Sequence, residues 1–180
     1  TAIMTGEKAR LGAISVGPAA DRDDCDAALT HSLPTLLEEL EDKGYRTGII
    51  STARITHATP AATYAHSPDR NWEADGAVPE ADRTRCKDIA RQLTEFDHGD
   101  GIDVVLGGGR SVFFPNSDSD PEQPDSKGVR GDGRNLISEW QQSRDDRHYV
   151  WNQTELDSLP ETGQVIGLFE ASHMQFEADR

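Results

Sequence analysis

Residues 46–73 read RTGIISTARITHATPAATYAHSPDRNWE, and this stretch decides how the whole chain is interpreted. Its first residues, Arg46–Ser51, form a β-branched run that predicts a strand. Hydroxyl and imidazole side chains follow at His57 and Thr59, and a guanidinium follows at Arg70. Hard oxygen ligands and a forked cation directly after a strand favour a site for phosphate and a metal ion.

Outward from this stretch, short apolar strands alternate with amphipathic helices. The predicted order is helix Leu33–Lys43, strand Arg46–Ser51, helix Ala81–Phe96, strand Ile102–Leu106, helix Leu136–Gln142, strand Tyr149–Trp151, a short helix after Asn152, and strand Val165–Phe169. Such alternation predicts an α/β fold, a three-layer sandwich with a mostly parallel central sheet covered on both faces. Functional residues in such sheets collect at the carboxyl ends of the strands.

Two parts of this pattern rest on local signals. Ser32 is expected to cap the first helix, with Pro34 in its first turn, Glu38 on its polar side and Gly44 as its end. Residues 1–16, TAIMTGEKARLGAISV, are expected to run from a helix through a loop into a strand. The chain therefore looks like a piece of a longer protein.

Composition excludes some functions. Asp and Glu number 33 against 18 Lys and Arg, which gives a net charge of −15 and argues against a nucleic-acid partner. No apolar run is long enough for a membrane span. The acidity is explained either by a solvated surface, suited to solubility and to a salty habitat, or by a cation-rich environment around metal sites.

The stretch from 115 to 134 is predicted to be an acidic surface loop. Most of it, NSDSDPEQPDSKGVRGDGR, combines prolines, glycines and acidic residues. The simplest interpretation is a solvated insertion, but a loop this long in a compact domain is usually functional or disordered.

Several motifs resemble alkaline phosphatases, in order along the chain. Beside STARITHATPAATYAHSPDRNWE, they are TAIMTGEKARLGAISV, RCKDIARQL, IDVVLGGGR, YVWNQTEL and GLFEASHM. Together they cover essentially the whole chain and are nearer to the animal-type branch than to the enteric bacterial branch. The resemblance identifies the chain as an internal segment of a bacterial or halophilic member of this family, a phosphomonoesterase that works through a phosphoserine.

The resemblance assigns roles in the central segment. Arg70 takes the position of the arginine that binds substrate phosphate, and Thr59 that of a hydroxyl ligand to Mg²⁺. His57 lies where the family has a residue beside the metal-bound water network. Without the resemblance, Arg70 would be read as a surface residue, Thr59 as a partner of the backbone and His57 as a structural histidine.

The resemblance also implies a Ca²⁺ site. Glu122, Glu170 and the backbone carbonyl of Phe169 match its ligands in the animal-type enzymes. Ca²⁺ takes six to eight oxygens, so these three groups would be insufficient alone. The remaining carboxylate would lie beyond Arg180, and a lone loop glutamate is otherwise a surface residue.

Cys25 and Cys86 resemble the first disulfide pair of the animal-type enzymes. An even cysteine count suits an exported protein, so a periplasmic or extracellular location is expected. Two free buried thiols are the alternative.

The family mechanism uses two Zn²⁺ ions and a serine nucleophile, with a homodimer as the common assembly. The serine would fall upstream of Thr1, and the zinc ligands would also fall outside this chain. We therefore expect the 180-residue polypeptide to be inactive and its parent to hydrolyse phosphate monoesters.

Two other classes remain. A related metallohydrolase of the same superfamily, such as a sulfatase or phosphodiesterase, would share the sheet and metals, but ATPAATYAH with Arg70 argues against it. A non-catalytic calcium-binding or interaction module would use the acidic loop, and would bind calcium tightly without binding phosphate.

Overall fold

The computed structural model describes residues 1–176 and 178. It divides the chain into two compact units. Unit 1 comprises residues 1–47 and 56–101, and unit 2 comprises residues 48–55 and the residues from 102 onward. No helix in the described part of the chain combines the length and the apolar character needed to cross a membrane.

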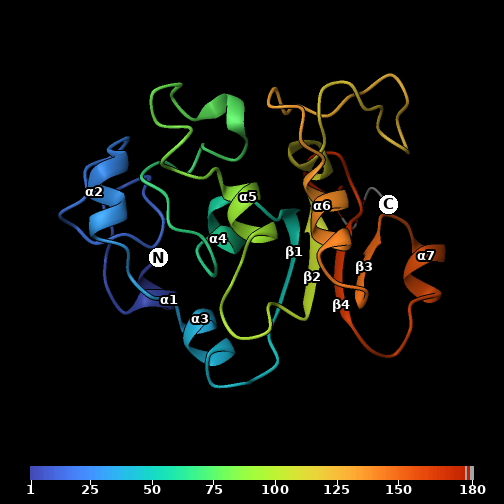
Figure 1. Ribbon diagram of the computed structural model, residues 1–180, viewed down its shortest axis with the longest axis horizontal. Coiled ribbons are helices and arrows are strands. Elements are labelled where there is room, and N and C mark those ends of the chain that lie inside the picture. The colour runs from blue at the N-terminus through green and yellow to red at the C-terminus, as the bar shows by residue number, and fades with distance from the viewer. Residues whose placement is uncertain (177, 179–180) are drawn as a thin grey trace. The chain divides into compact units, whose positions relative to one another are not determined.

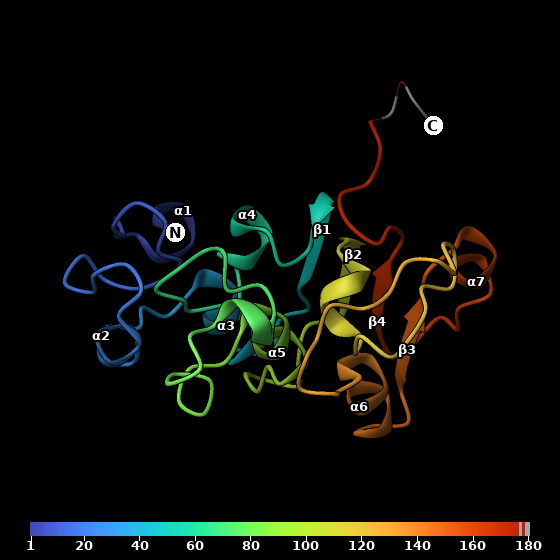
Figure 2. The same ribbon diagram turned by 90° about the horizontal axis from the view of Figure 1, so that it is seen from above.

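Unit 2 is built on a parallel sheet. Its strands are β1 (Gly48–Arg54), β2 (Val104–Gly108), β3 (Arg147–Val150) and β4 (Gln164–Leu168). Within the described residues they form a four-stranded sheet in the order β1-β2-β4-β3, and every pairing is parallel. Figure 1 and Figure 2 show this order in both views. The predicted α/β class with a parallel sheet is confirmed.

Backbone pairing between neighbouring strands, rather than the apolar run in the sequence, sets where the strands begin and end. Gly48 pairs with Val104 and Arg54 pairs with Gly108, so β1 and β2 each begin two residues later than predicted and extend further. The two central strands β2 and β4 carry the buried core, and Val105 and Ile166 stand opposite each other with almost no exposure.

Two helices of unit 2 follow their sequence signals. Helix α6 (Leu136–Gln142) has the predicted bounds, and Asn135 caps it by accepting a hydrogen bond from the Ser138 N–H. It packs against β3. Helix α7 (Gln153–Asp157) begins directly after its cap Asn152, as expected. A short 3₁₀ turn, η2 (Arg110–Phe113), follows β2.

Unit 1 consists of short helices joined by long connections. They are α1 (Ala2–Thr5), α2 (Cys25–Thr30), α3 (Leu36–Glu41), α4 (Ala58–Ala61), the 3₁₀ turn η1 (Asp75–Ala77) and α5 (Ile89–Thr94). The predicted strand in residues 1–16 is reduced to isolated bridges, in which Ile14 pairs with Ser67 and Val16 with Ser32.

Helix α3 begins later than Ser32 predicted. Thr35 caps it instead, because the Thr35 hydroxyl accepts the Glu38 N–H at 3.2 Å while the Glu38 carboxylate accepts the Thr35 N–H at 2.7 Å. Pro34 therefore lies before the helix. Glu38 was expected on the polar face, yet it is only 4% exposed. This reciprocal cap turns the carboxylate back toward the protein.

Helix α5 has only six residues, whereas a helix over Ala81–Phe96 was predicted. Asp88 accepts the Arg91 N–H and begins the helix there. The preceding residues form turns ending at Cys86, which is bonded to Cys25 in a disulfide. The two sulfurs lie in a small buried cluster with Trp72 and Val78. The alternative of free thiols is thereby removed.

The stretch 115–134 contains no regular helix or strand, as expected, but it is not solvated throughout. Arg130 is fully buried and Asp120 is 8% exposed. Bridges between Pro115 and Arg130 and between Ser119 and Lys127 fold the loop back on itself. The loop is therefore anchored by buried polar groups, which a purely solvated insertion would lack.

Candidate functional site

The first candidate site is in unit 1, where the chain turns into α4. His57 is the residue before this helix, and Arg70 follows the helix on the returning loop. Arg70 Nη2 lies 3.1 Å from His57 Nε2. An arginine has only donors, so His57 Nε2 is the acceptor in this contact. The predicted proximity of Arg70 and His57 is therefore present in the structure.

The backbone of Arg70 is fixed on both sides. Its N–H donates to the Gly12 carbonyl at 2.7 Å. Its neighbour Asp69 is 6% exposed and accepts two hydrogen bonds from the Arg22 guanidinium, at 3.0 and 3.1 Å. The Asp69 carboxylate also accepts the Asn71 N–H at 2.8 Å. The carboxylate next to Arg70 is thus already committed to another cation.

The Arg70 guanidinium keeps capacity for an anion. The side chain is half-buried, and no carboxylate among residues 1–176 and 178 forms an ion pair with it. A guanidinium presents five donors in a planar fork that matches two oxygens of a phosphate. With one corner directed to His57, Arg70 can offer the remaining donors to a tetrahedral anion.

Thr59 lies in α4, two residues after His57, and is exposed. Its hydroxyl is available as one oxygen ligand, but one hydroxyl cannot hold Mg²⁺ alone. In the described part of the chain, no group of three or more His, Cys, Asp or Glu residues could hold a metal ion.

A carboxylate that the sequence interpretation gave no role lies near this segment. Glu73 Oε2 accepts a hydrogen bond of 2.5 Å from the hydroxyl of Thr56, which is fully buried. The bond joins Thr56, which lies just before α4, to Glu73, which lies just after Arg70. In the sequence, nothing beyond the presence of an acidic residue at the end of the stretch 46–73 indicated this role for Glu73.

The predicted calcium groups are in unit 2, and an arginine that was not predicted gathers them. Arg110 Nη2 donates to Glu122 at 2.8 Å, and Arg110 Nη1 donates to the Leu168 carbonyl at 2.9 Å. The Arg110 N–H donates to the Glu170 carbonyl at 3.0 Å. Glu122 is thus brought to the end of β4, beside Phe169 and Glu170.

Four of the five guanidinium donors of Arg110 meet protein acceptors. Arg110 is fully buried and holds Asp120 through two bonds of 2.7 and 2.8 Å. Burial by itself raises the pKa of Asp120, but the bonds from Arg110 and from the Gln123 and Glu122 N–H groups outweigh it. The pKa of Asp120 therefore lies below its ordinary value. The Glu122 side chain keeps 42% exposure.

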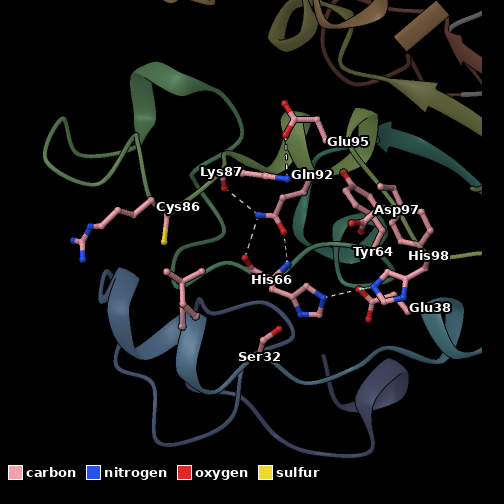
Figure 3. A pocket seen from close by; sticks show the side chains of 14 residues that line it. Ser32, Glu38, Tyr64, His66, Cys86, Lys87, Gln92, Glu95, Asp97 and His98 are labelled. Atoms are coloured by element: carbon pink, nitrogen blue, oxygen red, sulfur yellow. Dashed lines mark hydrogen bonds and ion pairs between the residues drawn. The ribbon is translucent and has the colours of Figure 1, made fainter. Parts of the chain in front are cut away.

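A cavity of about 340 Å³ in unit 1 lies elsewhere (Figure 3). Its polar lining includes Glu38, His66, Gln92 and His98. Arg70 is not part of that lining. The cavity and the predicted phosphate-binding arginine are separate features of the same unit.

Comparisons with known proteins agree with one another. A model of the alkaline phosphatase family matches residues 1–180. Alkaline phosphatase of Gadus morhua is 40% identical over 188 residues, which cover 100% of this chain and 39% of that protein. The tissue-nonspecific isozyme of Gallus gallus is 40% identical over 189 residues, 100% of this chain and 36% of that protein. The chain spans well under half the length of these relatives.

Solved structures show the same fold. A cold-active alkaline phosphatase from Shewanella sp. has a TM-score of 0.65 at 27% identity, covering 99% of this chain and 33% of that one. The Thermus thermophilus alkaline phosphatase has a TM-score of 0.67 at 26% identity, covering 99% of this chain and 29% of that one.

Proposed function

The chain belongs to the alkaline phosphatase family, and from this premise we propose that it is part of a phosphomonoesterase in which Arg70 binds the substrate phosphate. The observation that carries the proposal is the Arg70 guanidinium, held against His57 at 3.1 Å without a carboxylate partner among the described residues. An arginine kept charged, partly desolvated and unsaturated is suited to an anionic ligand.

We propose that Arg70 acts by positioning. Its backbone is tied to Gly12, and the Arg22–Asp69 pair holds the preceding residue. A guanidinium fixed in this way can grip two phosphate oxygens and hold the phosphorus in one orientation. It can also stabilise the charge that develops on those oxygens during the reaction.

For the metal ions, we propose that Thr59 supplies one hydroxyl ligand to Mg²⁺ and that His57 orients water near it. Support comes from the exposed Thr59 hydroxyl two residues from the His57–Arg70 contact. When bound, the Zn²⁺ and Mg²⁺ ions of such an enzyme supply charge for the phosphate and an activated nucleophile. The zinc ligands are proposed to lie outside these 180 residues.

For Ca²⁺, we propose Glu122, Glu170 and the Phe169 carbonyl. Their support is the Arg110 network, which brings Glu122 to the end of β4. One Glu122 oxygen is occupied by Arg110, so the carboxylate would offer its other oxygen. Six to eight oxygens are required, and further ligands must complete the site.

The Cys25–Cys86 disulfide suits an oxidising compartment, which supports the proposed periplasmic or extracellular location. We also propose that the complete protein is a homodimer, as the family resemblance implied.

Binding of inorganic phosphate to the 180-residue chain tests the role of Arg70. We expect Arg70→Ala to weaken phosphate binding at least about tenfold, measured by isothermal titration calorimetry. Arg46→Ala is the matched control, because Arg46 is an exposed arginine of the same unit. If the two variants bind phosphate equally well, Arg70 is not the phosphate ligand.

We further propose that the 180-residue chain alone does not hydrolyse p-nitrophenyl phosphate, because none of its residues matches the family's nucleophile or zinc ligands. A steady release of p-nitrophenol by the pure chain, lost in Arg70→Ala, would contradict this proposal.

A further inference from the structure

His66 connects three parts of unit 1 through one side chain and its own backbone. Its ring Nδ1 lies 2.9 Å from the Ser15 carbonyl. Its Nε2 lies 2.6 Å from Glu38 Oε1, as Figure 3 shows. The side chain of Gln92, on α5, accepts the His66 N–H at 2.8 Å and donates to its carbonyl at 3.1 Å. The N-terminal segment, α3 and α5 therefore meet at this residue.

The two ring contacts define the protonation state. A carbonyl oxygen only accepts, so Nδ1 must carry a proton toward Ser15. The second oxygen of the Glu38 carboxylate already accepts the Thr35 N–H, as an ionised capping carboxylate does. With Glu38 ionised, in keeping with its lowered pKa, Nε2 donates to Oε1, and the ring is an imidazolium with both nitrogens protonated.

The charges around the ring agree with this assignment. Burial by itself lowers the pKa of His66, but the hydrogen bond and the charge of Glu38, with the Ser15 carbonyl, raise it above its ordinary value. Burial raises the pKa of Glu38, and the bond and charge of His66 with the Thr35 N–H lower it overall.

Other charged groups surround the pair. His98 Nε2 is 3.6 Å from the same Glu38 oxygen, and His98 Nδ1 is 3.1 Å from Asp42. The remaining charged residues that line the cavity are Arg85, Lys87, Glu95 and Asp97. Lys87 and Glu95 pair with each other at 3.0 Å.

The carbonyl that His66 contacts is held in an uncommon conformation. Ser15 has φ +46, in the left-handed region that non-glycine residues rarely adopt. Its carbonyl also accepts the Leu33 N–H at 3.0 Å, and its hydroxyl donates to the Ala62 carbonyl at 3.0 Å. Such a conformation persists only where the surroundings fix it, and the His66 ring is one of those surroundings.

The same two segments carry Arg70. Ile14 and Ser67 exchange both backbone hydrogen bonds, at 2.8 and 2.9 Å, directly beside the Ser15–His66 contact. Further along the same two segments, the Arg70 N–H donates to the Gly12 carbonyl. Residues 12–15 and 66–70 thus form one short ladder, with the imidazolium at one end and Arg70 at the other.

We propose that His66 is a positioning residue for Arg70: its doubly protonated ring clamps the Ser15 carbonyl to Glu38 and fixes the ladder that presents the Arg70 guanidinium. Loss of one ring proton removes a donor from one of the two contacts and loosens the ladder. The hold of His66 on Ser15 and Glu38 therefore weakens as pH rises. As a role in phosphate binding, it rests on the function proposed above for Arg70.

The test uses nitrogen-15 NMR of the 180-residue chain without phosphate, across pH 5.5 to 10. In the wild type we expect both His66 ring nitrogens to be protonated at neutral pH. We also expect the amide signals of Ser67 and Arg70 to shift with the same midpoint as the ring. Both results follow from the clamp, since those amides donate across the ladder.

Glu38→Gln is the informative variant. A glutamine can still accept the Thr35 N–H, and its amide can donate to a neutral His66 Nε2, so the contacts persist without the charge. We expect the proton affinity of His66 to fall about tenfold. The Ser67 and Arg70 amides should then no longer shift at the wild-type midpoint, because the neutral ring keeps both contacts. His31→Gln, at an exposed histidine of the same unit, should leave all three midpoints unchanged.

The outcomes separate clearly. A His66 ring with one protonated nitrogen at neutral pH would overturn the proposal, and so would amides of Ser67 and Arg70 that ignore the ring's midpoint. A direct replacement, His66→Gln, removes the ring and could prevent folding. Glu38→Gln then still tests the proposal, because it keeps both contacts of the ring. If the amides follow His66 but inorganic phosphate does not bind, the clamp stands and the proposed function of Arg70 fails.

Discussion

Each of the two units holds one arginine at the centre of a predicted site, and the two arginines are partnered in opposite ways. Arg110 in unit 2 is fully buried and bonds Asp120, Glu122 and a backbone carbonyl, with the Trp151 ring 5.6 Å away. Arg70 in unit 1 is half-buried, and its guanidinium contacts the neutral acceptor of His57. Four of the five guanidinium donors of Arg110 meet protein acceptors, whereas among the described residues one donor of Arg70 does.

The number of protein acceptors around each guanidinium distinguishes a structural arginine from one suited to bind a ligand. A buried guanidinium with most of its donors on protein acceptors has little left for a substrate, and its removal leaves a buried carboxylate without its cation. A guanidinium held by its backbone but short of acceptors keeps its donors for an anion. The surroundings of each arginine therefore predict opposite effects of the same mutation.

The largest expected effect is on stability in unit 2. Arg110→Met should destabilise the fold by about 3–5 kcal/mol, because the buried Asp120 loses its cation. Arg70→Met should cost less than about 1 kcal/mol, since it breaks no ion pair with a described residue. Urea unfolding followed by tryptophan fluorescence measures both, and equal losses would erase the distinction between the two arginines.

A smaller effect on phosphate affinity is expected when Arg70 is replaced by a residue that keeps the positive charge but lacks the planar guanidinium. Arg70→Lys should weaken binding of inorganic phosphate about tenfold, about 1.4 kcal/mol, because an ammonium cannot donate along two parallel bonds. Stability should hardly change. Calorimetric titration measures the affinity, and a lysine variant that matches wild type would show that only charge matters at this site.

The contributions of Asp120 and His66 to stability should be lost at opposite ends of the pH scale. The pKa of Asp120 is lowered in the fold, so its contribution is present above its ordinary value of 3.8 and is lost as pH falls through the lower folded value. The pKa of His66 is raised, so its contribution is present below 6.5 and is lost as pH rises through the higher folded value.

Urea midpoints measured from acid to alkaline pH test this pair of expectations. Asp120→Asn should flatten the acid side alone. His66→Gln should flatten the alkaline side and, because Glu38 loses a partner that lowers its pKa, part of the acid side as well. An Asp120→Asn variant that flattens the alkaline side would contradict the assigned partners.

The smallest effect is expected at Glu122. This side chain is 42% exposed, and its bond to Arg110 adds to two that Asp120 already provides. Glu122→Gln should therefore change the free energy of unfolding by less than about 1 kcal/mol. Its effect on calcium affinity, measured by titration with Ca²⁺, should be larger than its effect on stability if Glu122 is a ligand.

Local signals in the sequence predicted the elements whose cause is local. The apolar runs predicted all four strands, and helix α6 and the Asn152 cap lie where the pattern placed them. Only the family resemblance, and no local signal, indicated the Cys25–Cys86 bond, whose cysteines are 61 residues apart. The short reach of the strand and helix signals explains why those elements could be predicted.

Features made by distant partners were not predictable in this way. Glu38 looked like a surface residue because its partner His66 lies 28 positions along the chain. Arg110 looked like the end of a glycine-rich turn because Asp120 and Glu122 lie in an irregular loop. Helix α5 was predicted too long because the bond to Cys25 holds the preceding turns. Tertiary contacts override propensity at each of these positions.

The outer strand β1 has a practical consequence for handling this polypeptide in concentrated solution. It pairs only with β2 among the described strands, and its Ile50 side chain is 75% exposed. The Thr52 carbonyl and the Arg54 N–H of β1 are already bonded, to the Met174 N–H and to His173. The rest of an outer strand that exposes a β-branched side chain is a template with which another copy can pair. Precipitation on storage should therefore begin at Ile50 despite the charge of −15, and light scattering should show that Ile50→Lys slows it.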